Sequence, residues 1–235
     1  PEISVDVNTG LKPDELLKII GDYHGLVIRS ETKVTPEVFA AAKNLKAIGR
    51  AGVGVDNIDR SAATDHGVVV MNTPSGNTIS TAEHAFALML SLARNIGQAH
   101  GSMIAGKWDR KTLSGVEMFG KRLAILGMGR IGTEFAKRAQ AFGMTVVAYD
   151  PFLTAARAQS LKVELAESAA IALTGADVVT LHIPLTPDTK HVLDAERIAL
   201  MNKGALIVNC ARGGLVDEAA AKASIDAGHL GGIAL

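Results

Sequence analysis

The sequence predicts an α/β protein that contains a doubly wound parallel sheet. Three observations lead to this prediction. From Asp14 onward, short apolar runs alternate with helical patterns, which is typical of parallel strands covered by helices. Two such arrays are separated by a long, apolar helical segment over residues 80–94. In the second array, a glycine-rich turn at residues 127–132 joins a strand to a helix.

The first array predicts a small α/β domain over residues 1–74. Thr35 and Pro36 suit the N-cap and the first position of a helix. We expect helices at residues 14–20, 36–42 and 61–65, and strands at residues 26–28, 45–48 and 68–71.

The segment between the arrays predicts one long helix. Residues 80–83 read Ser-Thr-Ala-Glu and match a capping box, so the helix is expected to run from Ser80 to about Arg94. Its apolar residues lie nearly all round the helix, which indicates burial between layers or at a subunit contact. A second helix is expected at residues 99–105, and a polar connector at residues 107–121.

The glycine-rich turn predicts a dinucleotide site. An apolar strand over residues 123–126 precedes it, a helix follows it, and Asp150 comes about 20 positions after the middle glycine. Gly127 permits the tight turn, Gly129 lets the backbone approach a pyrophosphate, and Gly132 lets helix and strand pack closely. The helix N-terminus attracts the phosphates. The alternative is a glycine-rich turn in a protein that binds no nucleotide.

Asp150 favours NAD over NADP. It ends the strand at residues 145–149, where a carboxylate can accept hydrogen bonds from ribose hydroxyls and repel a 2′-phosphate. Pro151 follows it, so the alternative is a turn-forming Asp-Pro pair.

The rest of the second array extends this domain over residues 75–235. Helices are expected at residues 166–173, 194–200 and 217–227, and strands at residues 178–181, 206–208 and 232–235. The last strand is still running at Leu235, so we expect the chain to be part of a longer protein and the fold to be incomplete at both ends.

Composition limits the class of protein. Lys+Arg and Asp+Glu are 24 each, so the formal net charge is zero, which argues against a general nucleic-acid or membrane-surface binder. Apolar runs are too short to span a membrane. A single cysteine, Cys210, excludes an internal disulfide and fits a reducing, cytoplasmic location. No metal site is predicted.

Arg212 is the main candidate for substrate binding. It follows the strand at residues 206–208, and ligand crevices form at the carboxyl ends of parallel strands. A guanidinium there can bind a carboxylate through two hydrogen bonds. The alternative is a structural or solvated arginine. By the same reasoning, His182 is interpreted as a core histidine, and Cys210 as a small buried residue and not a nucleophile.

Four segments resemble signatures of the D-isomer-specific 2-hydroxyacid dehydrogenases: residues 49–59 (GRAGVGVDNID), 71–74 (MNTP), 181–186 (LHIPLT) and 209–217 (NCARGGLVD). The resemblance covers nearly the whole chain. It implies a Rossmann NAD-binding domain at residues 75–235 and a smaller, flavodoxin-like substrate domain at residues 1–74. It also implies hydride transfer between NAD and a D-2-hydroxy acid, in a homodimer or homotetramer.

The resemblance also assigns site residues. Arg212 matches the family's catalytic arginine, whose glutamate and histidine partners would lie beyond Leu235. The cofactor would be held by residues of the turn and of three strand ends: Gly127, Gly129, Arg130, Ile131, Gly132, Asp150, Ile183, Pro184, Cys210, Ala211 and Arg212. The substrate would be held by a loop and two basic residues: Arg29, Arg50, Gly52, Val53 and Gly54.

The choice of substrate follows from Arg29 and Arg50, which match basic residues that bind a substrate phosphate in part of the family. They favour D-3-phosphoglycerate, oxidised to 3-phosphohydroxypyruvate in the first step of serine biosynthesis. One alternative is a glyoxylate or hydroxypyruvate reductase, or another D-2-hydroxyacid dehydrogenase. An alternative from a different class is an NAD-sensing interaction module similar to the corepressor branch of the family.

Overall fold

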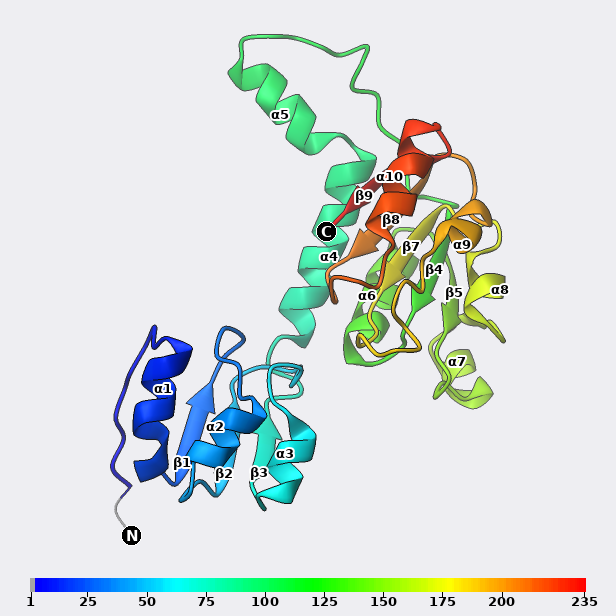
Figure 1. Cartoon of the computed structure of the whole chain (residues 1–235). Coiled ribbons are helices and arrows are strands. Elements are labelled where there is room, and N and C mark those ends of the chain that lie inside the picture. The colour runs from blue at the N-terminus through cyan, green and yellow to red at the C-terminus, as the bar shows by residue number, and fades with distance from the viewer. Residues whose placement is uncertain (1–2) are drawn as a thin grey trace. The chain divides into compact units, whose positions relative to one another are not determined.

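The structure, a computed structural model, describes residues 3–235. The chain divides into two compact units, Pro1–Asn77 and Thr78–Leu235. The expected boundary after Pro74 lies in the same connecting segment, between strand β3 (Val69–Asn72) and helix α4 (Thr78–Ala93). Both units alternate strands and helices, as the sequence predicts (Figure 1).

The first unit is built around a three-stranded parallel sheet in the order β1-β2-β3. Its elements, besides β3, are α1 (Pro13–Ile19), a short 3₁₀ helix η1 (Ile20–Asp22), β1 (Gly25–Ile28), α2 (Pro36–Ala41), β2 (Ala47–Arg50) and α3 (Arg60–Asp65). All the predicted strands and helices of this array are therefore present.

The two faces of this sheet differ in burial. Ile48 of β2 is fully buried in a core that also contains Phe39 of α2. On the other face, Val27 of β1 and Val69 and Met71 of β3 are more than half exposed. Among the described residues, the helices of the first unit therefore cover one face of its sheet.

The second unit opens with α4 and α5 (Ile96–Ile104). The predicted capping box is wrong, because α4 begins at Thr78 and Ser80 lies inside it. Glu83, the acidic member of the box, forms an ion pair with Arg138 instead, at 3.1 Å. Buried residues on α4, such as Phe86 and Met89, confirm its expected burial against the sheet layer.

A six-stranded, fully parallel sheet follows, in the order β6-β5-β4-β7-β8-β9. Its strands are β4 (Arg122–Leu126), β5 (Thr145–Tyr149), β6 (Glu164–Leu165), β7 (Val178–Leu181), β8 (Ala205–Asn209) and β9 (Leu230–Ala234). The order reverses direction between β4 and β7, as it does in doubly wound dinucleotide-binding sheets. The predicted fold class is confirmed.

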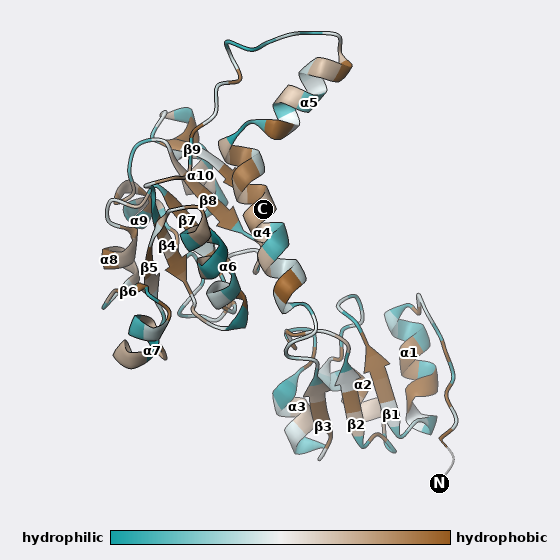
Figure 2. Cartoon of the chain, turned by 180° about the vertical axis from the view of Figure 1, so that it is seen from behind, coloured by the Kyte–Doolittle hydropathy of each residue, from teal (hydrophilic) through white to brown (hydrophobic). Residues whose placement is uncertain are grey.

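Helices cover both faces of this sheet (Figure 1). They are α6 (Arg130–Ala141), α7 (Ala155–Ser160), α8 (Ala169–Leu173), α9 (Ala195–Ala199) and α10 (Glu218–Asp226). Alternate residues of β4 belong to two cores: Leu123 and Ile125 face α4 and α6, whereas Ala124 and Leu126 face the side of α8 and α9. Figure 2 shows the apolar colouring of α4 and of the central strands beside the more polar α6.

Besides the short 3₁₀ helix η1, two elements were not predicted. Helix α7 has six residues and strand β6 has two, so neither is long enough to give a clear periodicity. Helix α8 begins at Ala169, three residues later than expected, because the Ser168 hydroxyl accepts a hydrogen bond from the Ile171 N–H and caps it there.

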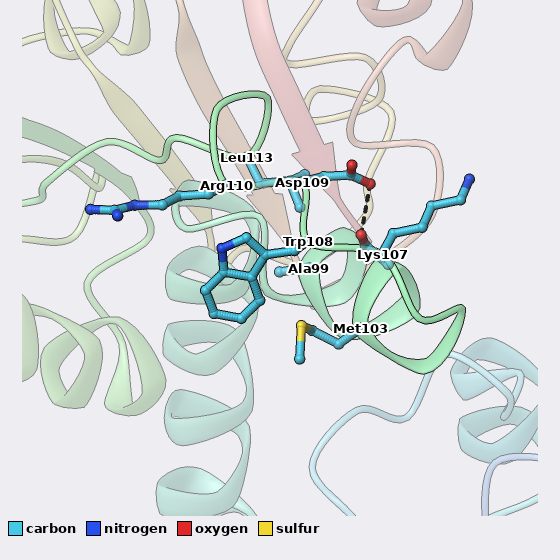
Figure 3. A pocket seen from close by; sticks show the side chains of 8 residues that line it. Ala99, Met103, Lys107, Trp108, Asp109, Arg110 and Leu113 are labelled. Atoms are coloured by element: carbon cyan, nitrogen blue, oxygen red, sulfur yellow. Dashed lines mark hydrogen bonds between the residues drawn. The ribbon is translucent and has the colours of Figure 1, made fainter.

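Helix α5 contributes no buried residue. Its Met103 and Ile104, with Trp108 of the following connector, are more than half exposed. Figure 3 shows a pocket here, lined by Met103, Trp108 and Arg110 among others. Ser102 also lines it, and its hydroxyl donates a hydrogen bond to Asp109. We call Ile96, Met103, Ile104 and Trp108 the α5 surface.

Within residues 3–235, no helix has the length and apolar character needed to cross a membrane.

A largely buried polar pair lies where β7 ends. The Thr180 hydroxyl and His182 Nε2 are 3.1 Å apart, and the His182 ring lies 5.4 Å from the ring of Phe135 on α6. Burial lowers the pKa of His182 to about 4, so the ring is neutral at physiological pH. This arrangement agrees with the interpretation of His182 as a core histidine.

We predict that this histidine makes stability depend on pH. The pKa is about 4 in the folded protein and 6.5 in a free histidine. The unfolded chain therefore binds more protons between these values, and stability falls as the pH is lowered from 6.5 towards 4. Between pH 7.5 and 5.5, wild type should lose about 1 kcal/mol of unfolding free energy that His182→Asn does not lose.

The measurement is urea unfolding at both pH values. His24→Asn, at an exposed position, is the matched control and should keep the wild-type pH dependence. Equal pH dependence in wild type and His182→Asn would contradict the assignment.

Candidate active site

The turn after β4 is closely packed at its first and third glycines. Gly127 has φ +98°, and a Cβ there would lie 2.6 Å from the His182 carbonyl oxygen. A Cβ on Gly132 would collide with the Gly127 carbonyl oxygen. Helix α6 is therefore able to start against the turn only because both positions lack a side chain.

The middle glycine differs from the other two. A Cβ on Gly129 would meet nothing within 4 Å, and its φ of −68° is allowed to any residue. Packing inside the protein therefore does not explain a glycine here, but close approach of a ligand does. Gly129 is also the N-cap of α6, where it offers no side chain to cap the backbone N–H groups. Arg130 and Ile131 begin this helix.

Asp150 ties the turn to the end of β5. Its Oδ2 accepts a hydrogen bond from the Met128 N–H, and its Oδ1 accepts one from the Phe152 N–H, both at 2.8 Å. Each carboxylate oxygen has capacity for a second hydrogen bond, so these contacts leave room for ribose hydroxyls. Asp150 therefore has a structural role in the turn as well as its predicted ligand role.

The segment after β7 is shaped by threonine hydroxyls. The Thr189 hydroxyl donates to the Pro184 carbonyl at 2.7 Å and also accepts from the Thr186 N–H at 2.7 Å. Ile183 packs against the core on the α8 side of the sheet. The predicted cofactor residues Ile183 and Pro184 thus lie in a fixed loop at the carboxyl end of β7.

The segment after β8 carries the other predicted residues. Cys210, Ala211 and Arg212 are all half-buried, and an Arg212 Nη1 group donates to the Ala211 carbonyl at 2.7 Å. Burial raises the pKa of the Cys210 thiol, so it is protonated at neutral pH, in agreement with its interpretation as a packed and not a nucleophilic residue.

The carboxyl ends of β4, β5, β7 and β8 are neighbours at one edge of the sheet. This edge brings the turn, Asp150, Pro184 and Arg212 to the point where the strand order reverses, which is where such sheets bind ligands. The pocket in Figure 3 lies elsewhere in the unit and is lined by none of the predicted site residues.

The predicted substrate residues lie in the first unit. Arg29 follows β1 and is exposed, whereas Arg50 ends the neighbouring β2, opposite Ile28. The Arg50 side chain lies over Gly52, where any Cβ would overlap the guanidinium. The Arg50 Nε is buried without a hydrogen-bond partner among the described residues.

The loop of Gly52, Val53 and Gly54 is held from β3. Asn72 Nδ2 donates to the Val53 carbonyl at 2.7 Å, and the Thr73 N–H donates to the Gly52 carbonyl at 3.0 Å. Among residues 3–235, no group of three or more His, Cys, Asp or Glu side chains is arranged to hold a metal ion.

Sequence reasoning missed several residues that shape the site, namely Asn72, Thr189 and Asn209. Asn209 is one of two buried polar residues in the described chain, beside Thr180. A polar residue that ends an apolar strand is a signal that could have been read from the sequence, because burial of its side chain requires hydrogen-bond partners.

This fold and this edge define a dinucleotide-binding α/β protein. Residues 86–235 match the family D-isomer specific 2-hydroxyacid dehydrogenase, NAD binding domain. The chain belongs to this family, which confirms the resemblance and the predicted cofactor class.

Relatives named D-3-phosphoglycerate dehydrogenase are about half identical to the chain. That of Methanocaldococcus jannaschii is 51% identical over 231 residues, 98% of this chain and 44% of the relative. That of Bacillus subtilis is 51% identical over 213 residues, 91% of this chain and 40% of the relative. The chain therefore spans less than half the length of these relatives.

Solved structures agree in fold. The TT0316 protein from Thermus thermophilus has a TM-score of 0.88 at 38% identity, over 99% of this chain and 73% of that one. A D-lactate dehydrogenase from Aquifex aeolicus, complexed with NAD and lactic acid, has a TM-score of 0.84 at 28% identity, over 92% of this chain and 65% of that one.

Two glycine variants should separate packing from ligand binding. Gly132→Ala places a methyl group against the Gly127 carbonyl and should lower the unfolding free energy by about 1–3 kcal/mol. Gly129→Ala meets open space, so its stability should stay within about 0.5 kcal/mol of wild type. It should weaken NAD binding at least about tenfold, because the methyl group occupies the path of the pyrophosphate.

Chemical unfolding and calorimetric titration with NAD measure the two effects. Unchanged NAD affinity in a folded Gly129→Ala protein would mean that the cofactor does not approach this turn.

Proposed function

We propose that the natural protein containing this chain transfers a hydride between NAD and a D-2-hydroxy acid, with D-3-phosphoglycerate as substrate and 3-phosphohydroxypyruvate as product. The observation that carries the proposal is the open space at Gly129, at the start of α6 and beside Asp150. The near 50% identity to relatives named D-3-phosphoglycerate dehydrogenase supports the choice of substrate.

The residues present fit NAD. The backbone N–H groups at the start of α6 would hold the pyrophosphate, with Gly127, Gly129 and Gly132 keeping the turn free of side chains. Asp150 would accept hydrogen bonds from the ribose and disfavour NADP. Ile183, Pro184, Cys210 and Ala211 would line the remaining length of the cofactor. When bound, the nicotinamide supplies or accepts the hydride.

Arg212 would orient the substrate. Its guanidinium can bind the carboxylate and also stabilise negative charge that develops on the C2 oxygen. Removal of the hydroxyl proton needs a base of matched pKa. We place that histidine and its glutamate partner after Leu235, as the family resemblance implies.

The first unit would bind the anionic end of the substrate. A buried guanidinium N–H without an acceptor costs free energy, and the Arg50 Nε is such a group. An anion at this edge would be bound by the Arg50 guanidinium once the side chain turns its Nε–H towards it, and Arg29 at the end of the adjacent strand adds a second positive charge. The backbone of Gly52, Val53 and Gly54 would bind the substrate carboxylate.

A smaller acid without phosphate remains the second candidate, as in glyoxylate or hydroxypyruvate reductases. The third is an NAD-sensing interaction module without turnover. With its single cysteine and zero net charge, the protein is proposed to work in the cytoplasm on a small molecule, and not on nucleic acid or membranes.

The test of this function is a steady-state assay of the natural protein. With NAD, turnover should be highest on D-3-phosphoglycerate and at least about tenfold lower on acids without phosphate. Arg212→Ala should abolish measurable turnover, a loss of at least about 100-fold, because charge on the oxygen is no longer stabilised. Its NAD affinity should stay within about threefold.

Arg110→Ala is the matched arginine control and should keep turnover. Arg110 lies in the connector after α5 and is distant in sequence from Arg212. Normal turnover in Arg212→Ala would refute the catalytic assignment. NAD binding with no turnover on any acid would favour the interaction module.

We also propose that the protein is a homodimer or homotetramer, with the α5 surface in a subunit contact. Four large apolar side chains are at least half exposed there: Ile96, Met103, Ile104 and Trp108. Contiguous exposed apolar residues of this kind are typical of association sites.

Replacing two of them should weaken association. Ile104→Glu with Trp108→Ser removes apolar contact and places a charge in the interface. The dissociation constant of the oligomer should therefore rise at least about tenfold. Light scattering after size-exclusion chromatography measures the mass. Phe152→Ser, which removes another highly exposed aromatic residue, is the control. An unchanged mass in the double variant would place the contact elsewhere.

A further inference from the structure

We infer that Asn209 is a positioning residue that fixes the backbone from which Arg212 projects. Asn209 is the last residue of β8 and is only 7% exposed. Its side chain points its two polar atoms at the segment that follows. The inference rests on the proposed function for the role of Arg212, and on hydrogen bonds for the role of Asn209.

Two hydrogen bonds close this segment on itself. Asn209 Oδ1 accepts from the Ala211 N–H at 3.0 Å, and Nδ2 donates to the Arg212 carbonyl at 2.8 Å. The orientation of the carboxamide is unambiguous, because an N–H needs an acceptor and a carbonyl needs a donor. One side chain thus holds the backbone both before and after the Arg212 Cα, through the N–H of the preceding residue and the carbonyl of Arg212 itself.

The chemistry of this clamp requires an amide. Aspartate offers no donor to the Arg212 carbonyl, serine is too short to reach both groups, and alanine offers neither contact. The clamp is also anchored, because Asn209 pairs with Leu181 at the end of β7. The hydrogen bonds of Asn209 therefore tie the loop that carries Arg212 to the sheet.

Position matters more than affinity for a group that acts on a developing charge. A displacement of about 1 Å can lower a rate about 100-fold. Loss of the clamp should therefore affect steps that use Arg212, and should leave the binding of NAD at the turn near Gly129 almost unchanged.

The test uses the natural full-length protein with Asn209→Ala and Asn209→Asp. The matched control is Asn202→Ala, which removes another asparagine clamp, on Gly175 and Asp177, at the opposite end of β8. We expect both Asn209 variants to lower kcat and raise KM for the hydroxy acid, with kcat/KM reduced at least about 30-fold. KM for NAD should rise less than KM for the hydroxy acid, because the turn at Gly129 does not depend on this clamp, and the control should resemble wild type.

A second readout does not depend on activity. Trypsin cleaves after arginine, so the rate of cleavage at the Arg212–Gly213 bond, followed by mass spectrometry, reports on how firmly the segment is held. It should rise at least about tenfold in the Asn209 variants. If Asn209→Ala does not fold, Asn209→Asp, which keeps the acceptor and the volume, serves alone.

The outcomes separate the two proposals. Wild-type kcat/KM and wild-type cleavage in a folded Asn209 variant would overturn the inference. If the Asn209 variants are cleaved faster but the wild-type protein turns over no hydroxy acid, the clamp is supported and the proposed function is refuted. An equal loss in Asn202→Ala would overturn the specific role of Asn209.

Discussion

The contact between Gly132 and the Gly127 carbonyl is the constraint on which the candidate site depends. It brings the first turn of α6 against the end of β4, so the helix N-terminus starts at the edge of the sheet where the strand order reverses. The partial positive charge of that terminus is therefore set by packing before any ligand binds. Asp150 then holds the Met128 N–H and fixes the remaining freedom of the turn. A change at either glycine would move the helix and not only the turn.

The segments that follow the neighbouring strands are also held in place by local hydrogen bonds. The segment after β7 is closed by Thr189, and the segment after β8 by Asn209. The two segments are joined further along, since the His191 N–H donates to the Gly214 carbonyl at 2.8 Å and the Leu193 N–H donates to the Leu215 carbonyl at 3.1 Å. Such backbone contacts between loops make the edge of the sheet a connected surface, which suits a site that must hold an extended ligand without large rearrangement.

Sequence periodicity predicted the strands well because each buried strand is a short apolar run bounded by turn residues. Periodicity did not reveal α7 and β6, because these elements are too short. The capping box was predicted wrongly, because Glu83 forms an ion pair with Arg138 of α6, a helix that is distant in sequence. The fingerprint glycines could be located from spacing alone. The roles of Asn72 and Asn209 could not, because spacing does not state which backbone group a buried amide will meet. The roles of Arg29, Arg50 and Arg212 in binding remain predictions.

The distribution of charge limits how the protein can attract an anionic substrate. The chain has no net charge, so an anionic substrate cannot be attracted by the protein as a whole. Attraction must be local, and the two units provide it differently. The second unit offers backbone N–H groups, whose partial charges suit a pyrophosphate that is approached closely. The first unit offers the guanidinium of Arg50, with its buried Nε lacking an acceptor, which suits a compact anion bound through directed hydrogen bonds. One substitution removes the guanidinium of Arg50, whereas every residue except proline keeps a backbone N–H group. Anion binding at Arg50 is therefore expected to be more sensitive to mutation than pyrophosphate binding at the start of α6.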